Sequence, residues 1–231
     1  AIRYPIRRTH LAVVLWCAES GRGDELASME RFVYKLAETL GAGNESLFIP
    51  ADQVTGWAWI AISPDAAVTA VERVRAISEA EPDAPWVAIG SPLPDLAGFR
   101  HSHRQARDAR TVATFSGAPR HRATAAGDAG LAVVSLLGSN PAAAADWVGE
   151  VLGPLASDTA NDHRLRETLR VFLAAGSSYT GAADVLHLHH NSVKYRVRRA
   201  VGRRGRSITA DRLDVEVALT LCHWLGTAVL G

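Results

Sequence analysis

YTGAADVLHLHHNSVKYRVRRAVG, residues 179–202, is the stretch that decides how the C-terminal part of this chain folds. It contains two short helical patterns, 179–186 and about 190–202, separated by a turn. In the second pattern Val193 and Val197 recur at the spacing of one helical face, so both are expected to point inward. Two short helices joined by a tight turn form a helix-turn-helix, and 179–202 is the predicted core of this motif.

The second helix of the motif has the side chains that a DNA recognition helix needs. Such a helix combines an apolar inner stripe with polar or basic groups at its N-terminal end, where base edges are reached. Asn191 is the residue type that pairs bidentately with adenine, and Lys194 and Arg198 suit guanine or phosphate. The turn position that is often glycine is His187 here, so the sequence leaves the turn geometry open. The predicted DNA-binding residues are His189, His190, Asn191, Ser192, Lys194, Tyr195, Arg198, Arg199 and Arg203.

Positive charge is concentrated in and just after this helix. The whole chain has a formal charge of +1, but between His187 and Arg206 there are seven basic residues and no acidic one. The rest of the chain holds 18 basic and 24 acidic residues, a net charge of −6. Arg203, Arg204 and Arg206 are predicted to follow the helix and to contact backbone phosphates. A solvated basic helix is the alternative, but the coincidence with a helix-turn-helix favours duplex DNA as the partner.

The pattern before residue 128 mixes strands and helices. His10–Cys17 reads as a buried strand, followed by a turn with Gly21 and Gly23. Further strands are predicted at 46–50, 56–63, 86–90 and about 123–126, and helices at about 26–40, 65–80 and 98–115. The order β-α-β-β-α-β, with an α-β extension, predicts an antiparallel sheet with helices packed on one face, as in ferredoxin-like and nucleotide-cyclase-like domains.

From residue 128 onward only helical patterns remain. They cover about 128–138, 141–153, 161–175, 179–186, 190–202 and 210–226. The predicted fold class is therefore α+β, with a ferredoxin-like domain over 1–127 and an all-α helix-turn-helix domain over 128–231. The last helix is apolar almost all round, which is typical of a buried helix, and a dimer seam is the alternative. A homodimer or higher oligomer is expected, because a single helix-turn-helix makes few base contacts.

Several of these residues resemble one family of regulators. Leu186–Val197, with Leu169–Leu173 and Gly153-Pro154-Leu155, resembles the C-terminal domain of PucR/CdaR-type regulators. Ala88-Ile89-Gly90 and Gly98–His103 are similar to the degenerate nucleotide-cyclase (GGDEF-like) domain that precedes it in that family. The resemblance implies a transcriptional regulator, often of catabolic genes, and the presence of only two distant cysteines fits a reducing, cytoplasmic location. The resemblance also implies a small-molecule effector bound by a further N-terminal domain, which fits a chain that begins with alanine.

Other site chemistries have little support in the sequence. A nucleotide cyclase needs metal-binding carboxylates where the first strand ends, but that strand reads Val13–Cys17, and the following hairpin has Asp52 as its one acid. His187, His189 and His190 are expected to point in different directions. Two distant cysteines give neither a disulfide framework nor a zinc site. We therefore expect no catalytic residues, no metal and no cofactor.

The sequence as a whole predicts a sequence-specific DNA-binding transcriptional regulator. Its apolar runs are strand-sized, far short of the roughly 20 residues of a membrane span, so no membrane contact is expected. Two alternatives remain. One is a protein-protein interaction or dimerisation module, which salt-dependent DNA binding would exclude. The other is a nucleotide-processing enzyme, which nucleotide triphosphate turnover would reveal.

Overall fold

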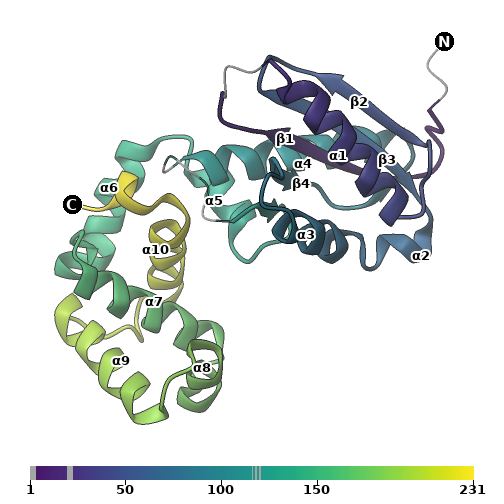
Figure 1. Cartoon of the computed structure of the whole chain (residues 1–231). Coiled ribbons are helices and arrows are strands. Elements are labelled where there is room, and N and C mark those ends of the chain that lie inside the picture. The colour runs from purple at the N-terminus through teal and green to yellow at the C-terminus, as the bar shows by residue number, and fades with distance from the viewer. Residues whose placement is uncertain (1–3, 20–22, 116, 118, 120) are drawn as a thin grey trace. The chain divides into compact units, whose positions relative to one another are not determined.

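A computed structural model describes residues 4–19, 23–115, 117, 119 and 121–231. The predicted turn at Gly21 lies outside these residues. The chain forms two compact units, residues 1–132 and 133–231 (Figure 1). The boundary proposed from the sequence, 127/128, falls just before this division.

The first unit is built around one mixed sheet. Its elements are β1 (Thr9–Trp16), α1 (Glu25–Thr39), β2 (Ser46–Pro50), β3 (Thr55–Ile62), α2 (Pro64–Ala67), α3 (Ala70–Ala80), β4 (Trp86–Ile89), β5 (Leu93–Pro94), α4 (Asp95–Thr114) and β6 (Ala123–Ala125). The strand order is β2-β3-β1-β4-β6, with β5 beside β1. The pairs within β2-β3-β1-β4 are antiparallel, as predicted. The edge pair β4-β6 is parallel instead, because α4 forms a crossover that brings the chain back in the same direction.

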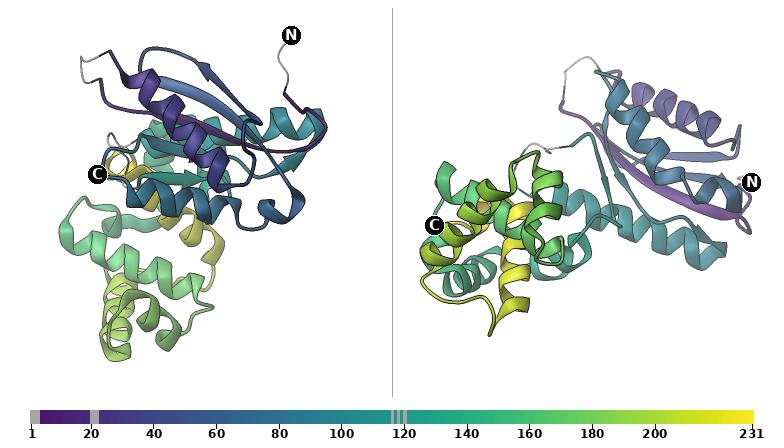
Figure 2. Two further views of the ribbon diagram at one scale, coloured as in Figure 1. Left: turned by 45° about the vertical axis from the view of Figure 1, so that its right-hand side comes forward. Right: turned by 90° about the horizontal axis from the view of Figure 1, so that it is seen from below.

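Helices cover both faces of this sheet, so the expectation of helices on one face was wrong. Leu11, Val13 and Leu15 of β1 join the apolar core that includes side chains of α1 and α3. On the other face the Ala12 main-chain N–H donates to Ser102 Oγ of α4 over 2.9 Å. Figure 2 (right) shows α4 on the opposite side of the sheet from α1. The physical reason is that β1 is apolar at almost every position, so both of its faces need to be covered.

The crossing of α4 over the sheet is close at Gly90 and Ser102. A Cβ atom added at Gly90 would lie 2.1 Å from the main-chain oxygen of Ser102, so no side chain fits there. The Gly90 N–H donates to the carbonyl of Ala12 over 2.9 Å, which continues the pairing between β1 and β4. These contacts give a structural reason for the glycine and the serine at these two positions.

Replacing Ser102 with alanine is expected to lower the free energy of unfolding by about 2 kcal/mol, because the buried N–H of Ala12 loses its acceptor. Urea unfolding followed by tryptophan fluorescence measures this effect. Ser78→Ala is the matched control: Ser78 is equally buried, but its hydroxyl only donates to the carbonyl of Val74 within its own helix. Equal losses in the two variants would contradict the special role of Ser102.

One predicted helix is divided in two. The sequence predicts a continuous helix over 65–80, whereas α2 ends at Ala67 and α3 begins at Ala70. Ser63 caps α2 by accepting a hydrogen bond from the Ala66 N–H, and Val68, at the break, is 84% exposed. The spacing of apolar residues does not reveal such a break, because both pieces present their apolar side chains to the same sheet face.

The rest of the described chain is helical after β6, which confirms the α+β class. Its elements are α5 (Leu131–Leu137), α6 (Pro141–Leu152), η1 (Gly153–Ala156), α7 (Ala160–Ala174), α8 (Tyr179–Leu186), α9 (His190–Arg204), α10 (Arg212–Leu225) and η2 (Gly226–Val229). The α10 helix packs against α6 and α7 through buried side chains that include Val215, Leu219 and Cys222. Leu213 of this helix is 71% exposed, so the helix is not buried on all sides as its apolar sequence suggested. Among the described residues, no helix is both long and apolar enough to cross a membrane.

Candidate nucleic-acid interface

The predicted helix-turn-helix is present as α8, a three-residue turn and α9. Val193 and Val197 point inward and are almost fully buried, and α9 packs on both α7 and α8. Ser178 begins α8, because its Oγ accepts a hydrogen bond from the Gly181 N–H over 3.0 Å. The rings of Phe172 in α7 and Tyr179 in α8 stack with their centres 4.7 Å apart. The α7 helix therefore contacts both helices of the motif, α8 and α9.

The turn between α8 and α9 depends on His187. This residue has the left-handed backbone conformation, with φ 51° and ψ 45°. The next N–H, that of Leu188, donates to the carbonyl of Ala183 over 3.0 Å and so ends α8. The turn geometry that the sequence left open is thus the usual one for glycine, adopted here by histidine.

Replacing His187 with glycine is expected to raise the free energy of unfolding by about 1 kcal/mol, because a Cβ atom disfavours the left-handed conformation. The opposite kind of change at a second left-handed residue, Gly205→Ala at φ 83°, should lower the free energy of unfolding by a similar amount. The added Cβ would meet no neighbouring side chain or backbone within 4 Å, so backbone strain is the expected cause. Thermal and urea unfolding of both variants measure the two effects. If His187→Gly were destabilising instead, the contacts of the histidine ring would contribute more to the free energy of unfolding than the left-handed backbone of His187 costs.

The α9 helix extends further than predicted. Its first residue follows His189, whose Nδ1 accepts a hydrogen bond from the Asn191 N–H over 3.2 Å. It ends at Arg204, followed by Gly205, whereas the sequence placed its end near residue 202. Arg203 and Arg204 therefore belong to the helix and have fixed directions, instead of following it in a free segment.

All nine predicted DNA-binding residues are exposed, on α9 or on its N-terminal cap. They are His189, His190, Asn191, Ser192, Lys194, Tyr195, Arg198, Arg199 and Arg203. They share the helix surface opposite Val193, Val197 and Ala200, as a recognition helix requires. The first six occupy its N-terminal cap and first two turns, and the three arginines its second half.

Arg203 is exposed but already has a partner. Its Nε donates to Asp162 Oδ1 over 3.1 Å and its Nη2 to Oδ2 over 3.4 Å. Asp162 also accepts a hydrogen bond from Thr159 and is only 2% exposed. Burial alone would raise the pKa of Asp162, but the hydrogen bonds from Arg203 and Thr159 outweigh it and lower the pKa. This ion pair joins the last turns of α9 to the first turn of α7.

Arg204 does not lie where it could reach a phosphate, which corrects the sequence-based expectation. Its side chain is fully buried, and it donates to the carbonyls of Val151 and Ser207 over 2.8 Å each. It also forms an ion pair with Asp211. Arg206 is more exposed but donates to the carbonyl of Val151 as well, over 3.0 Å. Both arginines therefore hold this unit together.

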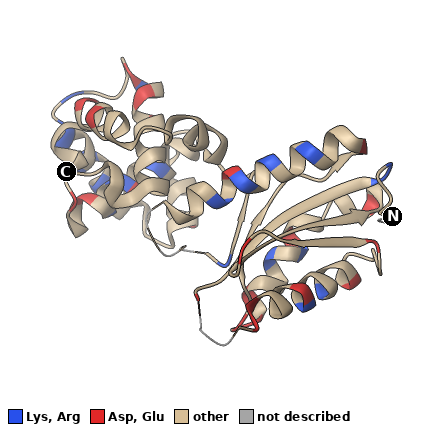
Figure 3. Cartoon of the chain, turned by 90° about the horizontal axis from the view of Figure 1, so that it is seen from above, with Lys and Arg blue, Asp and Glu red and all other residues tan. Residues whose placement is uncertain are grey.

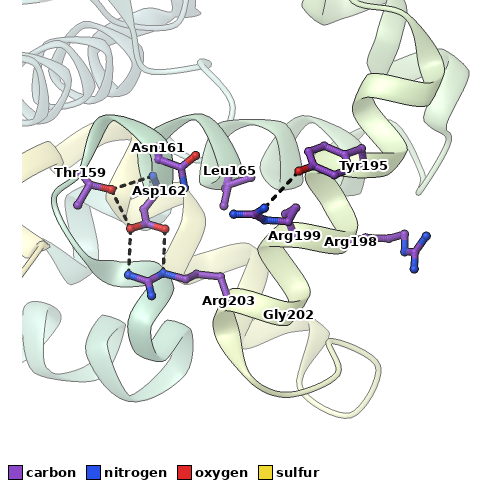
Figure 4. A pocket seen from close by; sticks show the side chains of 9 residues that line it. All are labelled: Thr159, Asn161, Asp162, Leu165, Tyr195, Arg198, Arg199, Gly202 and Arg203. Atoms are coloured by element: carbon purple, nitrogen blue, oxygen red, sulfur yellow. Dashed lines mark hydrogen bonds and ion pairs between the residues drawn. The ribbon is translucent and has the colours of Figure 1, made fainter.

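A cavity of about 770 Å³ opens between the start of α7 and the second half of α9 (Figure 4). It is lined by Thr159, Asn161, Asp162, Leu165, Tyr195, Arg198, Arg199, Gly202 and Arg203. The three α7 residues in this set and the cap residue Thr159 were missed as site residues from the sequence. The pattern Thr159-x-x-Asp162 marks the start of a helix, but it does not reveal that this start faces α9. That information exists only in the packing of the two helices.

The charge of α9 distinguishes it from the other basic helix of the chain. Figure 3 shows basic residues along α4 as well. The α4 helix contains four arginines but also two aspartates, whereas α9 contains six basic residues and no acid. Of these two helices, α9 is the one without acidic residues, and a cationic helix of this kind is attracted to the phosphates of a duplex.

The place where a nucleotide cyclase would bind its metal is the end of β1. Here Cys17, Asp24 and Glu25 border a cavity of about 450 Å³. Burial, with the nearby charges of Glu25 and Asp24, raises the pKa of the Cys17 thiol. In the described part of the chain, no three His, Cys, Asp or Glu side chains gather as metal ligands would.

Comparisons with known proteins match both units. Residues 165–221 match the family model of the PucR C-terminal helix-turn-helix domain, and residues 1–112 match that of the GGDEF-like domain. A search of curated proteins gives no match. A regulator of polyketide synthase expression from Bifidobacterium adolescentis is similar to the chain at 21% identity, with a TM-score of 0.39, over 94% of this chain and 80% of that one.

Proposed function

We propose that this chain, a DNA-binding transcriptional regulator composed of a GGDEF-like domain and a PucR-type helix-turn-helix domain, recognises its operator through the N-terminal half of α9. The observation that carries this proposal is the two-sided character of that helix. Val193 and Val197 fix it to the rest of the domain, while Asn191 and Lys194 are exposed on its other side. A helix held in this way can enter the major groove without losing its packing.

The roles along α9 follow from residue type and position. His190, Asn191, Ser192 and Lys194 are nearest the N-terminal end, where side chains of a recognition helix reach base edges. Asn191 is the one best suited to specify a base, because its amide can pair bidentately with adenine. Tyr195, Arg198 and Arg199 follow in the next turns, where cations can contact phosphates. His189 acts indirectly, as the cap that begins the helix.

We further propose that the protein acts as a homodimer on two half-sites and that its first domain is catalytically silent. One α9 offers few base-reading side chains, so two copies about one helical turn of DNA apart supply the required affinity. The last residues of β1 and the one that follows, Leu15-Trp16-Cys17, bear no carboxylate. Asp24 and Glu25 lie near this end, but among the described residues they are not part of a group of three metal ligands. The role that remains for this domain is to sense a signal or to dimerise with a second copy of the chain.

The experiment that tests the function is a titration of the chain with duplex DNA from its own promoter region, against a shuffled duplex of the same length. Binding is followed by the fluorescence anisotropy of the labelled duplex at salt concentrations of about 50–200 mM. Preference for the promoter with a steep salt slope is expected. Absence of DNA binding at every salt concentration would favour an interaction module, and turnover of a nucleotide triphosphate by the same sample would favour an enzyme.

A further inference from the structure

The cavity between α7 and α9 is larger and more mixed in character than base reading requires. Its volume is about 770 Å³, and it lies beside the second half of α9, away from Asn191. Leu165 and the Tyr195 ring give it apolar walls, while Arg199 and Asn161 give it polar ones (Figure 4). A lone inorganic anion would leave the apolar walls uncovered. A ligand that alternates charged and carbon-rich groups would use both.

Arg198 and Arg199 supply positive charge that the protein itself does not neutralise. Arg203 is paired with Asp162, and among the ion pairs of the described residues none involves Arg198 or Arg199. The Arg199 Nη1 donates to the Tyr195 hydroxyl over 3.2 Å, and its guanidinium lies 5.9 Å from the centre of the Tyr195 ring. This contact holds Arg199 along the cavity with most of its donors unused.

The distance along α9 from Asn191 to Arg199 is close to the width of the major groove. Arg199 follows Asn191 by eight residues, or about 12 Å along a helix. The major groove is also about 12 Å wide. When Asn191 reaches a base edge, Arg199 therefore lies about one groove width away, where the phosphates of a strand are found.

We propose that this cavity seats one segment of the DNA sugar-phosphate backbone. Arg199 binds a phosphate, and the Asn161 amide completes the site from the first turn of α7. Arg198, whose side chain points away from Asn161 (Figure 4), is left to contact a neighbouring phosphate. The neighbouring deoxyribose carbons lie against Leu165 and the Tyr195 ring. Asp162 does not repel the phosphate, because its charge is taken up by Arg203, which acts as a positioning residue. The inference rests on the proposed function and adds α7 to the DNA-contacting surface.

The test uses the full chain and the promoter duplex. Arg199→Ala is expected to reduce the slope of log K against log salt by about 1, and to weaken promoter and shuffled duplexes by the same factor. Arg199→Lys should restore the slope, because it restores the charge. The matched control is Arg212→Ala, an exposed arginine of α10 that is paired with Glu216 and should leave the slope unchanged. Asn161→Asp, which places a negative charge in the cavity, should weaken binding more than Asn161→Ala.

A chemical probe of the DNA identifies the phosphate itself. Duplexes with a single uncharged methylphosphonate are compared at each position near the recognised bases. One position should weaken binding of the unchanged protein and have no effect on Arg199→Ala, since the charge pair is already lost. Arg199→Ala could instead leave both the salt slope and the methylphosphonate profile unchanged while the protein still prefers its promoter. This result would overturn the proposal and leave the proposed function intact. A second contrary result concerns the DNA-free protein at constant ionic strength. If inorganic phosphate raised the melting temperature of the unchanged protein but not that of Arg199→Ala, the proposal would be overturned in favour of a free-anion site.

Discussion

Replacing Arg204 with alanine is expected to lower the free energy of unfolding by about 3 kcal/mol. The side chain is fully buried at the end of α9, and it donates to the carbonyls of Val151 and Ser207. Its loss leaves the Ser207 carbonyl without this donor, removes the charge that faces Asp211, and opens a cavity next to α6. Urea unfolding followed by circular dichroism at a helical wavelength measures the effect.

The matched control for Arg204 is Arg206. It stands two residues away and donates to the Val151 carbonyl as well, but its side chain is about half exposed. Arg206→Ala should therefore cost below about 1 kcal/mol. At a temperature where both variants are folded, Arg204→Ala should also keep the salt slope of DNA binding, because a buried guanidinium contacts no phosphate. A stable Arg204→Ala with a reduced salt slope would return this arginine to the DNA-contacting surface.

The error about Arg204 shows what charge counting in a sequence can and cannot reveal. Arg203, Arg204 and Arg206 form one basic run, yet they have different surroundings: one is paired at the surface, one is buried and one is half exposed. A sequence gives the charge but not the partner. The spacing did contain a signal, because Val197, Ala200 and Arg204 follow one another on the inner side of α9.

The local parts of the motif were predicted well because local side chains determine them. The sequence placed α8 at 179–186, and the structure has it at Tyr179–Leu186. Ser178 begins this helix, and the left-handed His187 ends it, so both limits depend on residues within the motif. The strand at 46–50 was also placed at its observed residues. These elements needed no knowledge of the rest of the fold.

The long-range parts could not be predicted with the same success. The sequence indicated α4, but not that it covers the second face of the sheet and packs through Ser102 against β1. It likewise indicated α7 and α9, but not that Asp162 and Arg203 meet across them. In both cases the decisive contact joins residues that are far apart in the chain. Helix periodicity gives the face that is buried and not the element that buries it.

Replacing Asn191 with alanine is expected to remove about 1–3 kcal/mol of discrimination between promoter and shuffled duplex, roughly 5- to 150-fold in the ratio of affinities. The side chain is exposed on α9, and its main-chain N–H is already bound by the cap residue His189. Since this hydrogen bond uses only the main-chain N–H, the side-chain amide of Asn191 is available to pair with a base. Alanine also favours a helix more than asparagine does, so the change should not unfold α9.

The comparison with Arg199→Ala makes this result specific to base recognition. Arg199→Ala should lower affinity for both duplexes together and reduce the salt slope, whereas Asn191→Ala should lower affinity for the promoter alone and keep the slope. The two measurements use the same duplexes and the same salt series. If the promoter preference survived Asn191→Ala, a different residue of α9 would have to read the operator, because an exposed amide at its N-terminal end would then contribute nothing to specificity.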